Sequence, residues 1–391
     1  MRQDTKPCCA GLQVVKTVAI RVLYLHHVGQ ISGAENSLLL LLRNLDRSRV
    51  VPFFAGPGSG PFPDALAAEH VPVQPVPFGR LRNLAGLAHS VRCLGKVIKD
   101  RRIDLLHSNG PQTNVCAGIA GRLAHVPAVW HARNLLEKGM WDVDRTAAGL
   151  ASRIICNSEA IRDRFRGSKA WKKTVTILNA VDTREFSPQV NREDFRREME
   201  LPPGVPAVGI VGRIGTGKGH EYFLDAAIKL LRAGTTAQFL IVGAPIFAED
   251  AWRVDVLRRR VQEEHYEKCI RFTGLRRDIP QVMRGLDVLV LASDAEPCGR
   301  VLFEAMASGT AIVATKSGGT PEIIRDEQEG LLVPPRDPTA LARAIGRLVT
   351  DPQLQESLGR NGVLRAHREF TVERYIALTL DVYAQVTLSV W

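Results

Sequence analysis

The sequence predicts an α/β protein with two doubly wound parallel sheets, each carrying helices on both faces. Three observations predict this fold. Short apolar runs alternate with helix-length amphipathic stretches along the chain, as they do in successive βαβ units. The 391 residues, of which 45% are hydrophobic, suffice for two sizeable cores. A charged, proline-bearing stretch at 182–206 interrupts the alternation and indicates a linker between the halves.

The expected elements follow from the apolar runs in chain order. The strands of the first half are expected at 18–25, 50–55, 73–76, 103–107, 128–131, 153–157 and 174–178, and those of the second half at 207–212, 238–243, 270–273, 288–291, 311–314 and 330–333. One short helix is expected at 192–200, and a long helix with an apolar face at 372–388. We therefore expect an N-terminal Rossmann-like domain at 1–188, a second one at 189–371 and a C-terminal helical segment at 372–391.

Composition excludes several classes of protein. No uninterrupted apolar run approaches about 18 residues, so a membrane-spanning helix is not expected. Residues 1–16 lack the apolar core of a secretory signal, which favours a cytoplasmic location. The seven cysteines are odd in number and mostly scattered, which argues against a disulfide framework and gives no zinc-ligand spacing; they are Cys8, Cys9, Cys93, Cys116, Cys156, Cys269 and Cys298.

The excess of positive over negative charge comes entirely from the first half of the chain. Residues 1–188 hold 26 basic and 14 acidic side chains, a net of +12, whereas residues 189–391 hold 26 and 27, a net of −1. The surplus of basic side chains in residues 1–188 could form a surface that meets an anionic membrane or an acidic acceptor. It could equally form a solvated basic surface without a partner. Nucleic acid is not expected as a partner, because no aromatic interleaving or binding motif accompanies the basic residues.

Two glutamates eight residues apart, Glu296 and Glu304, are the best indication of function. They follow the apolar run 287–291 in a Gly/Pro-bearing loop that opens a helix. This places carboxylates, backbone N–H groups and a helix N-terminus at the carboxyl edge of a parallel sheet, where open α/β sheets bind ligands. A solvated helix face is the ordinary alternative. Phe303 and the apolar run 311–314 favour a buried helix instead, on which carboxylates need polar partners.

A glycine-rich loop at 212–219 follows the apolar run 207–211. By its letters it nearly matches a phosphate-binding P-loop, but Gly219 stands where a Ser or Thr would hold magnesium. A second interpretation requires only that Arg213 and Lys218 converge on an anion beside a helix N-terminus. The loop could also be a turn with two solvated cations.

In the first half, two strand ends carry candidate binding groups. The loop after the first strand contains Gly33 and Ala34 at the start of a leucine-rich helix, where glycine lets the backbone approach a ligand closely. His131 ends an apolar strand, either as a hydrogen-bonded structural residue or as a site residue. Neighbouring strand ends and loops add Arg133, Asn134, His107 and Asn109 as candidates for an acceptor pocket.

The glutamate pair, followed by Gly318-Gly319-Thr320-Pro321-Glu322, resembles the retaining nucleotide-sugar glycosyltransferases of the GT-B fold, family 4 type. The resemblance implies two Rossmann-like domains facing across a cleft, with the last helix packing back on the first domain. It implies that Glu296 contacts hydroxyls of the donor sugar and that Glu304 binds the nucleotide ribose.

The resemblance also implies roles for the other candidates. His131 borders the reacting sugar carbon, and Gly212-Arg213 with Lys218-Gly219 binds the donor diphosphate in place of a metal. The loop with Gly33 and Ala34 resembles the family's Gly-Gly-x-Glu loop, with Ser32 in place of the first glycine. The amides of Cys298, Gly299, Arg300 and Val301 line the sugar and diphosphate, and the base meets backbone near Gly274 and Leu275.

The expected activity is transfer of a sugar from a UDP-, GDP- or ADP-sugar to a hydroxyl of a glycan, a lipid-linked or a small-molecule acceptor, with retention of configuration. No cofactor is expected. No metal is expected either, since no Asp-x-Asp motif follows a strand. Polysaccharide or glycolipid biosynthesis on the inner face of a membrane would suit such an enzyme. A non-catalytic nucleotide-sugar-binding scaffold of the same fold is the alternative, and a P-loop NTPase is a more distant one.

Overall fold

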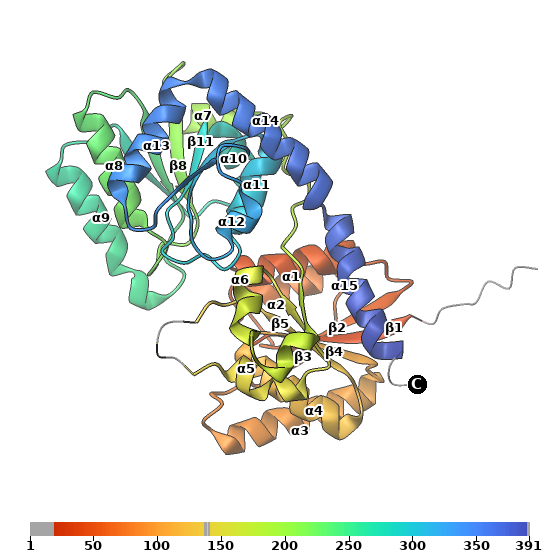
Figure 1. Cartoon of the computed structure of the whole chain (residues 1–391). Helices are drawn as coiled ribbons and strands as arrows, with labels where there is room; N and C mark the ends of the chain where they lie inside the picture. Colours follow the sequence, from red (N-terminus) through yellow and green to blue (C-terminus); the bar gives the residue numbers. More distant parts are fainter. Residues whose placement is uncertain (1–18, 137–138, 140, 389–391) are drawn as a thin grey trace, which may run out of the picture.

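The first of two parallel sheets occupies the N-terminal half of the chain in the computed structural model, which describes residues 19–136, 139 and 141–388 (Figure 1). Its strands are Ile20–Leu25 (β1), Val50–Gly56 (β2), Val73–Pro75 (β3), Leu105–Asn109 (β4), Ala128–Ala132 (β5), Arg153–Cys156 (β6) and Thr174–Thr176 (β7). Their spatial order is β3-β2-β1-β4-β5-β6-β7. The order reverses direction between β1 and β4, and doubly wound sheets bind ligands at such a switch point.

The second sheet is formed by the C-terminal half. Its strands are Ala207–Val211 (β8), Gln238–Val242 (β9), Ile270–Gly274 (β10), Val288–Leu291 (β11), Ala311–Thr315 (β12) and Leu331–Val333 (β13). The order is β10-β9-β8-β11-β12-β13, so the switch point lies between β8 and β11. The glycine-rich loop and the glutamate loop leave these two neighbouring strands, which is the reason they meet.

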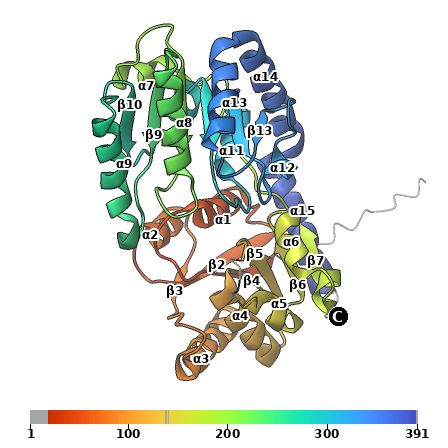
Figure 2. The same cartoon turned by 60° about the vertical axis from the view of Figure 1, so that its left-hand side comes forward.

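Helices cover both faces of each sheet (Figure 2). They are Gly33–Asn44 (α1), Pro61–Ala68 (α2), Leu84–Arg101 (α3), Pro111–Ala124 (α4), Val143–Ala147 (α5), Glu159–Arg162 (α6), Glu193–Glu198 (α7), His220–Arg232 (α8), Trp252–Glu263 (α9), Ile279–Gly285 (α10), Arg300–Ser308 (α11), Thr320–Ile323 (α12), Pro338–Thr350 (α13), Pro352–Glu369 (α14) and Val372–Thr387 (α15). Two apolar clusters pack against each sheet, one on either face. Within the described residues, no helix combines the length and the hydropathy needed to cross a bilayer.

The expected strands are confirmed, with each end within two residues of its expected position. The strand expected at 103–107 starts later because α3 continues to Arg101 and ends through Arg102 in a left-handed conformation (φ 50°). The helix expected at 192–200 is shorter and spans Glu193–Glu198. Residues 1–16, with Cys8 and Cys9, lie outside the described residues, and the domain boundaries at 188 and 371 stay predictions.

The chain passes between the two sheets twice, and the two passages lie side by side. The backbone N–H of Val181 donates to the carbonyl of Phe370 at 3.0 Å, and Val181 pairs with Thr371 in an isolated parallel bridge. After the second passage α15 packs against α1 (Figure 1). Its Tyr375 and Tyr383 are buried in the apolar cluster that also contains residues of β1 and β4.

Candidate functional site

The glycine-rich loop and the glutamate loop are joined by an ion pair at the β8/β11 switch point. The ammonium of Lys218 lies 2.8 Å from Glu296 Oε2, and the Ser293 hydroxyl donates to the same oxygen at 3.1 Å. Glu296 is 6% exposed. A buried carboxylate needs such partners, since an unpaired charge in the interior is costly. Glu296 therefore has Lys218 and Ser293 as polar partners, and its contact with a donor sugar stays a prediction.

Arg213 and Lys218 pair with different carboxylates, and their convergence on an anion stays a prediction. The guanidinium of Arg213 donates to Asp250 Oδ2 at 3.1 Å, whereas Lys218 pairs with Glu296. Both cations nevertheless act on His220, the first residue of α8, which is 2% exposed. Burial, followed by the charges of Lys218 and Arg213, lowers the pKa of His220 to about 4. The start of α8 is thus an electropositive place, as an anion site requires.

The helix α11 begins in the loop that carries Glu296. Gly299 is its N-cap residue, and the first helical residue, Arg300, donates from Nη2 to Glu304 Oε1 at 2.7 Å. Glu304 is 7% exposed and Cys298 is 6% exposed. The first backbone N–H groups of a helix have no intrahelical partner, so those of Arg300 and Val301 are available at this end of α11. The helix is short and buried, as the sequence predicted.

Three glycines lie where the backbones of β8, β9 and β10 end. The N–H of Gly212 donates to the carbonyl of Val242 at 2.9 Å, and that of Gly243 donates to Gly274 at 2.9 Å. A side chain at Gly243 would overlap the carbonyl oxygen of Gly212, and its φ of 141° also favours glycine. The next residue after β10, Leu275, is 69% exposed. The structure brings Gly212 and Gly274 to the same edge of the sheet, with Leu275 at its solvent side.

The loop after β1 meets the glutamate loop across the junction between the domains. Gly33 is the first residue of α1, Ala34 the second, and a Cβ atom at Gly33 would lie 4.0 Å from Arg300 Cδ. Ser32 caps this helix in a box with Glu35, whose carboxylate accepts from the N–H of Ser32 at 2.8 Å. The first residues of α1 and α11 therefore lie close to each other across the junction.

His131 ends β5 as a buried, neutral ring. It is 1% exposed, and burial together with Arg133 and His107 lowers its pKa well below the usual value. Arg133 Nη2 lies 3.2 Å from His131 Nδ1. A guanidinium can only donate, so Nδ1 carries the lone pair and Nε2 carries the proton. Among the described residues no hydrogen-bond partner meets this buried Nε2.

A chain of buried polar groups lies behind His131. His107 Nε2 lies 3.3 Å from His131 Nδ1, and His107 Nδ1 lies 2.5 Å from the hydroxyl of Tyr383. Burial and Arg133 lower the pKa of His107 to about 3, so this ring is neutral as well. Since His131 Nδ1 accepts from Arg133, His107 Nε2 is the donor of the pair that it forms with His131. The hydroxyl of Tyr24 lies 3.1 Å from that of Tyr383 and continues the chain.

Sequence reasoning missed Tyr383 and understated Asn179. Tyr383 is 276 residues from His107, so no local pattern connects them. The Nδ2 of Asn179 donates to the carbonyl of Cys298 at 3.4 Å, and its Oδ1 accepts from Arg133 Nη1 at 3.2 Å. It thus joins the candidate acceptor side to the glutamate loop. Asn134, by contrast, is exposed, and its carbonyl accepts from Arg164.

No group of three or more His, Cys, Asp or Glu side chains in the described part of the chain is arranged to hold a metal ion. The cations of this site are instead side chains: Lys218, Arg213 and Arg300, each paired with a carboxylate.

Comparison with known families identifies the chain. The profile described as glycosyl transferases group 1 matches residues 205–351, and the one described as Glycosyltransferase Family 4 matches residues 31–185. Together they span well over half of the chain. The chain belongs to the family 4 glycosyltransferases. This glycosyltransferase is 29% identical over 350 residues to the D-inositol 3-phosphate glycosyltransferase of Streptomyces bingchenggensis, covering 84% of this chain and 74% of that one.

Further relatives agree with the family and the fold. A UDP-Gal:alpha-D-GlcNAc-diphosphoundecaprenol alpha-1,3-galactosyltransferase of Escherichia coli is 24% identical, over 86% of this chain and 88% of its own. The crystal structure of HepE of Anabaena in complex with UDP-glucose superposes with a TM-score of 0.82 and 26% identity, covering 94% of this glycosyltransferase and all of HepE. The predicted GT-B fold is confirmed.

Proposed function

We propose that this enzyme transfers a hexose from a nucleotide-diphospho-sugar to an acceptor hydroxyl, with retention of anomeric configuration and without a divalent metal. The observation that carries the proposal is the contact between Lys218 and Glu296 at the β8/β11 switch point. It sets a cation suited to a diphosphate beside a carboxylate suited to sugar hydroxyls. The nucleotide would lie along the same edge, with its ribose on Glu304.

Departure of the diphosphate is the step that needs charge stabilisation. Negative charge grows on the phosphate oxygen as the bond to the sugar C1 breaks, and fixed donors aimed at that oxygen lower the barrier. Lys218, Arg213 and the free amides at the start of α11 are the candidates for those donors. They take over the function that a metal ion has in other transferases.

The acceptor would bind on the N-terminal side of the junction. Its oxygen forms the new bond to C1 on the face from which the phosphate leaves, and its proton passes to the departing phosphate oxygen. Two carboxylates flanking the bond would be needed for the hydrolase-type mechanism. The buried, unpartnered Nε2–H of His131 supports a role as a hydrogen-bond donor to the sugar, because an unsatisfied buried donor costs about 1–3 kcal/mol.

A thermal-shift panel tests the donor site directly. UDP-, GDP- and ADP-sugars are added to the protein in EDTA, beginning with UDP-glucose because HepE was crystallised with it. We expect one nucleotide class to raise the melting temperature by several degrees, since a ligand at 100 times its Kd stabilises the folded state by about 2.7 kcal/mol. A shift that appears only after Mg²⁺ is added would refute metal independence, and the absence of any shift would refute the donor site.

The two alternative functions, a P-loop NTPase and a non-catalytic scaffold, require different features of the site. In a P-loop, residue 219 would carry a hydroxyl side chain, but Gly219 has a φ of 73° and a Cβ there would overlap the carbonyl oxygen of Ala292. The NTPase alternative is therefore disfavoured. A non-catalytic scaffold would bind nucleotide sugar without breaking it. Lys218, Arg213, Glu296 and Glu304 are all present, which favours catalysis, and slow hydrolysis of the bound donor would distinguish the two.

An anionic membrane surface is also part of the proposal, since the E. coli relative is named for a diphosphoundecaprenol-linked acceptor. The supporting surface is the apolar groove between α3 and α4. Leu84 and Leu123 line it and are 75% and 74% exposed, and Arg92 and Lys99 line it as well. Apolar side chains with cations beside them match an anionic bilayer, where each Lys or Arg contributes about 1 kcal/mol.

Vesicle sedimentation tests this surface. We expect the protein to bind phosphatidylglycerol vesicles and not phosphatidylcholine vesicles, and the double variant Leu84→Ser/Leu123→Ser to lose most of the binding. Leu364→Ser is the matched control, because Leu364 is 70% exposed on α14 of the other domain. Equal binding by the double variant and the wild type would exclude the α3/α4 groove as the membrane surface.

A further inference from the structure

The segment Gly318-Gly319-Thr320-Pro321-Glu322 has no role in the site described above, although it forms the end of the turn after β12 and most of α12. It lies directly against the glutamate loop. The N–H of Gly319 donates to the carbonyl of Glu296 at 2.8 Å, and side chains at Gly318 and Gly319 would overlap the carbonyls of Glu296 and Pro297. The backbone of this turn is therefore in close contact with the backbone of the glutamate loop, so we expect the two to move together.

The same turn also meets the N-terminal domain. A Cβ atom at Gly319 would lie 2.8 Å from Ser158 Cβ, and one at Gly318 would lie 3.0 Å from Leu135 Cδ1, in the loop that follows β5. Glu322 completes this contact. Its Oε2 accepts the backbone N–H of Glu159 at 2.6 Å, and its Oε1 accepts that of Ala160 at 2.9 Å. Both amides belong to the first turn of α6.

These hydrogen bonds satisfy donors that α6 cannot satisfy itself. The first N–H groups of a helix lack intrahelical acceptors. The side chain of Ser158 accepts the third of them, from Ile161 at 3.2 Å, which leaves the first two to the carboxylate from the other domain. A single side chain of the C-terminal domain thus binds the N-terminal domain through two charge-assisted hydrogen bonds, which are stronger than neutral ones.

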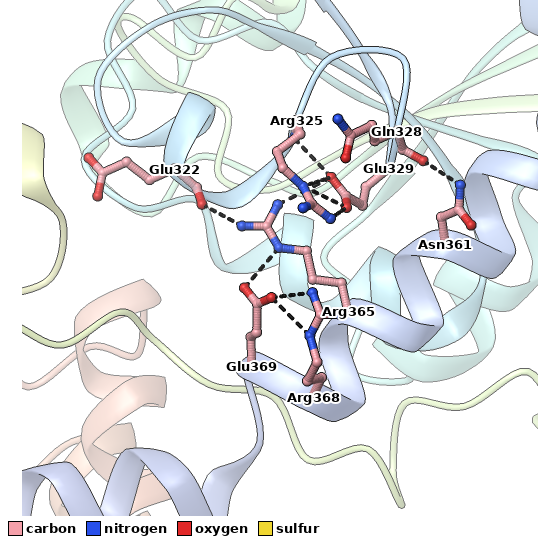
Figure 3. A network of polar contacts seen from close by, with 8 residues as sticks. All are labelled: Glu322, Arg325, Gln328, Glu329, Asn361, Arg365, Arg368 and Glu369. Atoms are coloured by element: carbon pink, nitrogen blue, oxygen red, sulfur yellow. Dashed lines mark hydrogen bonds and ion pairs between the residues drawn. The ribbon is translucent and has the colours of Figure 1, made fainter.

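The main chain of Glu322 is held firmly within its own domain (Figure 3). Arg365 donates from Nη2 to the Glu322 carbonyl at 3.0 Å, and from Nη1 to Glu329 at 3.2 Å. Glu329 is 1% exposed and also accepts from Arg325. In Figure 3 the carboxylate of Glu322 points away from this network, so the anchored residue extends only its side chain toward α6.

The Glu322 carboxylate is partly buried at this contact. Burial raises its pKa, the two amide bonds lower it, and the nearby carboxylates of Glu159 and Asp163 raise it again, with a net upward direction. Desolvation and the two neighbouring carboxylates therefore offset part of the attraction between the carboxylate and the two amides.

We propose that Glu322 is a positioning residue that holds the two domains together. It thereby places the glutamate loop opposite His131 of the N-terminal domain. This rests on the proposed function in so far as Glu296 holds the donor sugar. Glu322 itself touches no substrate. It acts through α6 on one side and through the Gly319–Glu296 hydrogen bond on the other.

The test compares Glu322→Ala and Glu322→Gln with the wild type, using UDP-glucose as the probe. Glu327→Gln is the matched control, because the Glu327 carboxylate pairs with Arg347 inside its own domain. Small-angle scattering measures the radius of gyration with and without UDP-glucose. Donor hydrolysis gives kcat, and calorimetry gives the Kd for UDP.

We expect E322A to be more open in scattering and to lose kcat by roughly 10- to 100-fold, the cost of a misplaced reacting group, while its Kd for UDP stays unchanged. E322Q should lie between E322A and the wild type, because its amide oxygen accepts without a charge. A wild-type kcat and radius of gyration in both variants would overturn the proposal, even with a lowered Tm, since Glu322 would then only cap α6.

Failure of the proposed function gives a different result. If the wild type neither binds nor hydrolyses UDP-glucose, the function proposed for this donor fails. An open E322A in the absence of ligand would still support the closing role of Glu322, and equal radii of gyration for the unliganded proteins would overturn it.

Discussion

Lys218→Met is expected to lower kcat/KM for the nucleotide sugar by about 10²- to 10³-fold, the usual cost of removing one fixed donor from a developing oxyanion. The ammonium of Lys218 is at the switch point, 2.8 Å from the carboxylate of Glu296 and beside the start of α8. Methionine is unbranched and only one atom shorter than lysine, and it carries no charge, so the loss reports mainly electrostatics rather than packing. Steady-state kinetics of donor hydrolysis or transfer measures it.

The control for this variant lies on α8, the helix that follows the loop carrying Lys218. Lys229 is exposed on α8, so Lys229→Met removes one charge from the same domain without changing the switch point. It should retain wild-type kinetics. The double variant Lys218→Met/Glu296→Gln should lose less than the sum of the two single losses, because the residues share one ion pair. A wild-type kcat/KM in Lys218→Met would remove Lys218 from the leaving-group site.

Glu304→Ala is expected to weaken UDP binding by roughly 10- to 100-fold, because hydrogen bonds to a charged group contribute about 1.5–3 kcal/mol. The carboxylate is buried at the first turns of α11 and holds the guanidinium of Arg300 at 2.7 Å. A ribose diol would present two hydroxyls to the remaining acceptor capacity of this carboxylate. Titration calorimetry with UDP in EDTA measures the change in Kd.

Two further variants distinguish a lost contact with the ribose from a general loss of protein stability. Glu304→Gln keeps an acceptor oxygen and should lose less affinity than alanine does. Glu356→Ala removes a carboxylate that pairs with Arg360 on the exposed face of α14, and it should bind UDP like the wild type. An unchanged Kd in Glu304→Ala, with the fold intact, would show that the ribose lies elsewhere.

Much of the fold could be predicted because its signals are local. Each buried strand is a short apolar run between turn residues, and the run 288–291 was placed without error. The meeting of Lys218 and Glu296 was also predictable, since adjacent parallel strands bring their carboxyl ends to one edge. Strand ends were less certain, because at β4 the left-handed cap of α3 at Arg102 decides where the strand begins.

The remaining contacts depend on residues that no local pattern connects. Arg213 pairs with Asp250, which lies 37 residues away in the short 3-10 helix Ala248–Asp250. Tyr383 contacts His107 across 276 residues of sequence, and Glu322 contacts the N–H of Glu159 across 163 residues. These partners are too far apart in the sequence for a short-range sequence pattern to predict their contact. Three-dimensional packing alone brings them together.

The return of α15 to the first sheet has a consequence for synthesis on the ribosome. Tyr375, Val382, Tyr383 and Val386 of this helix belong to the apolar cluster on one face of the N-terminal sheet. The strands of that sheet are complete once Thr176 has been added, yet these four side chains emerge about 200 residues later. At roughly 5–20 residues per second, the nascent domain must wait at least about 10 seconds with an apolar surface uncovered. Chaperones that shield such surfaces during translation would therefore have their longest opportunity to act on the first domain rather than the second.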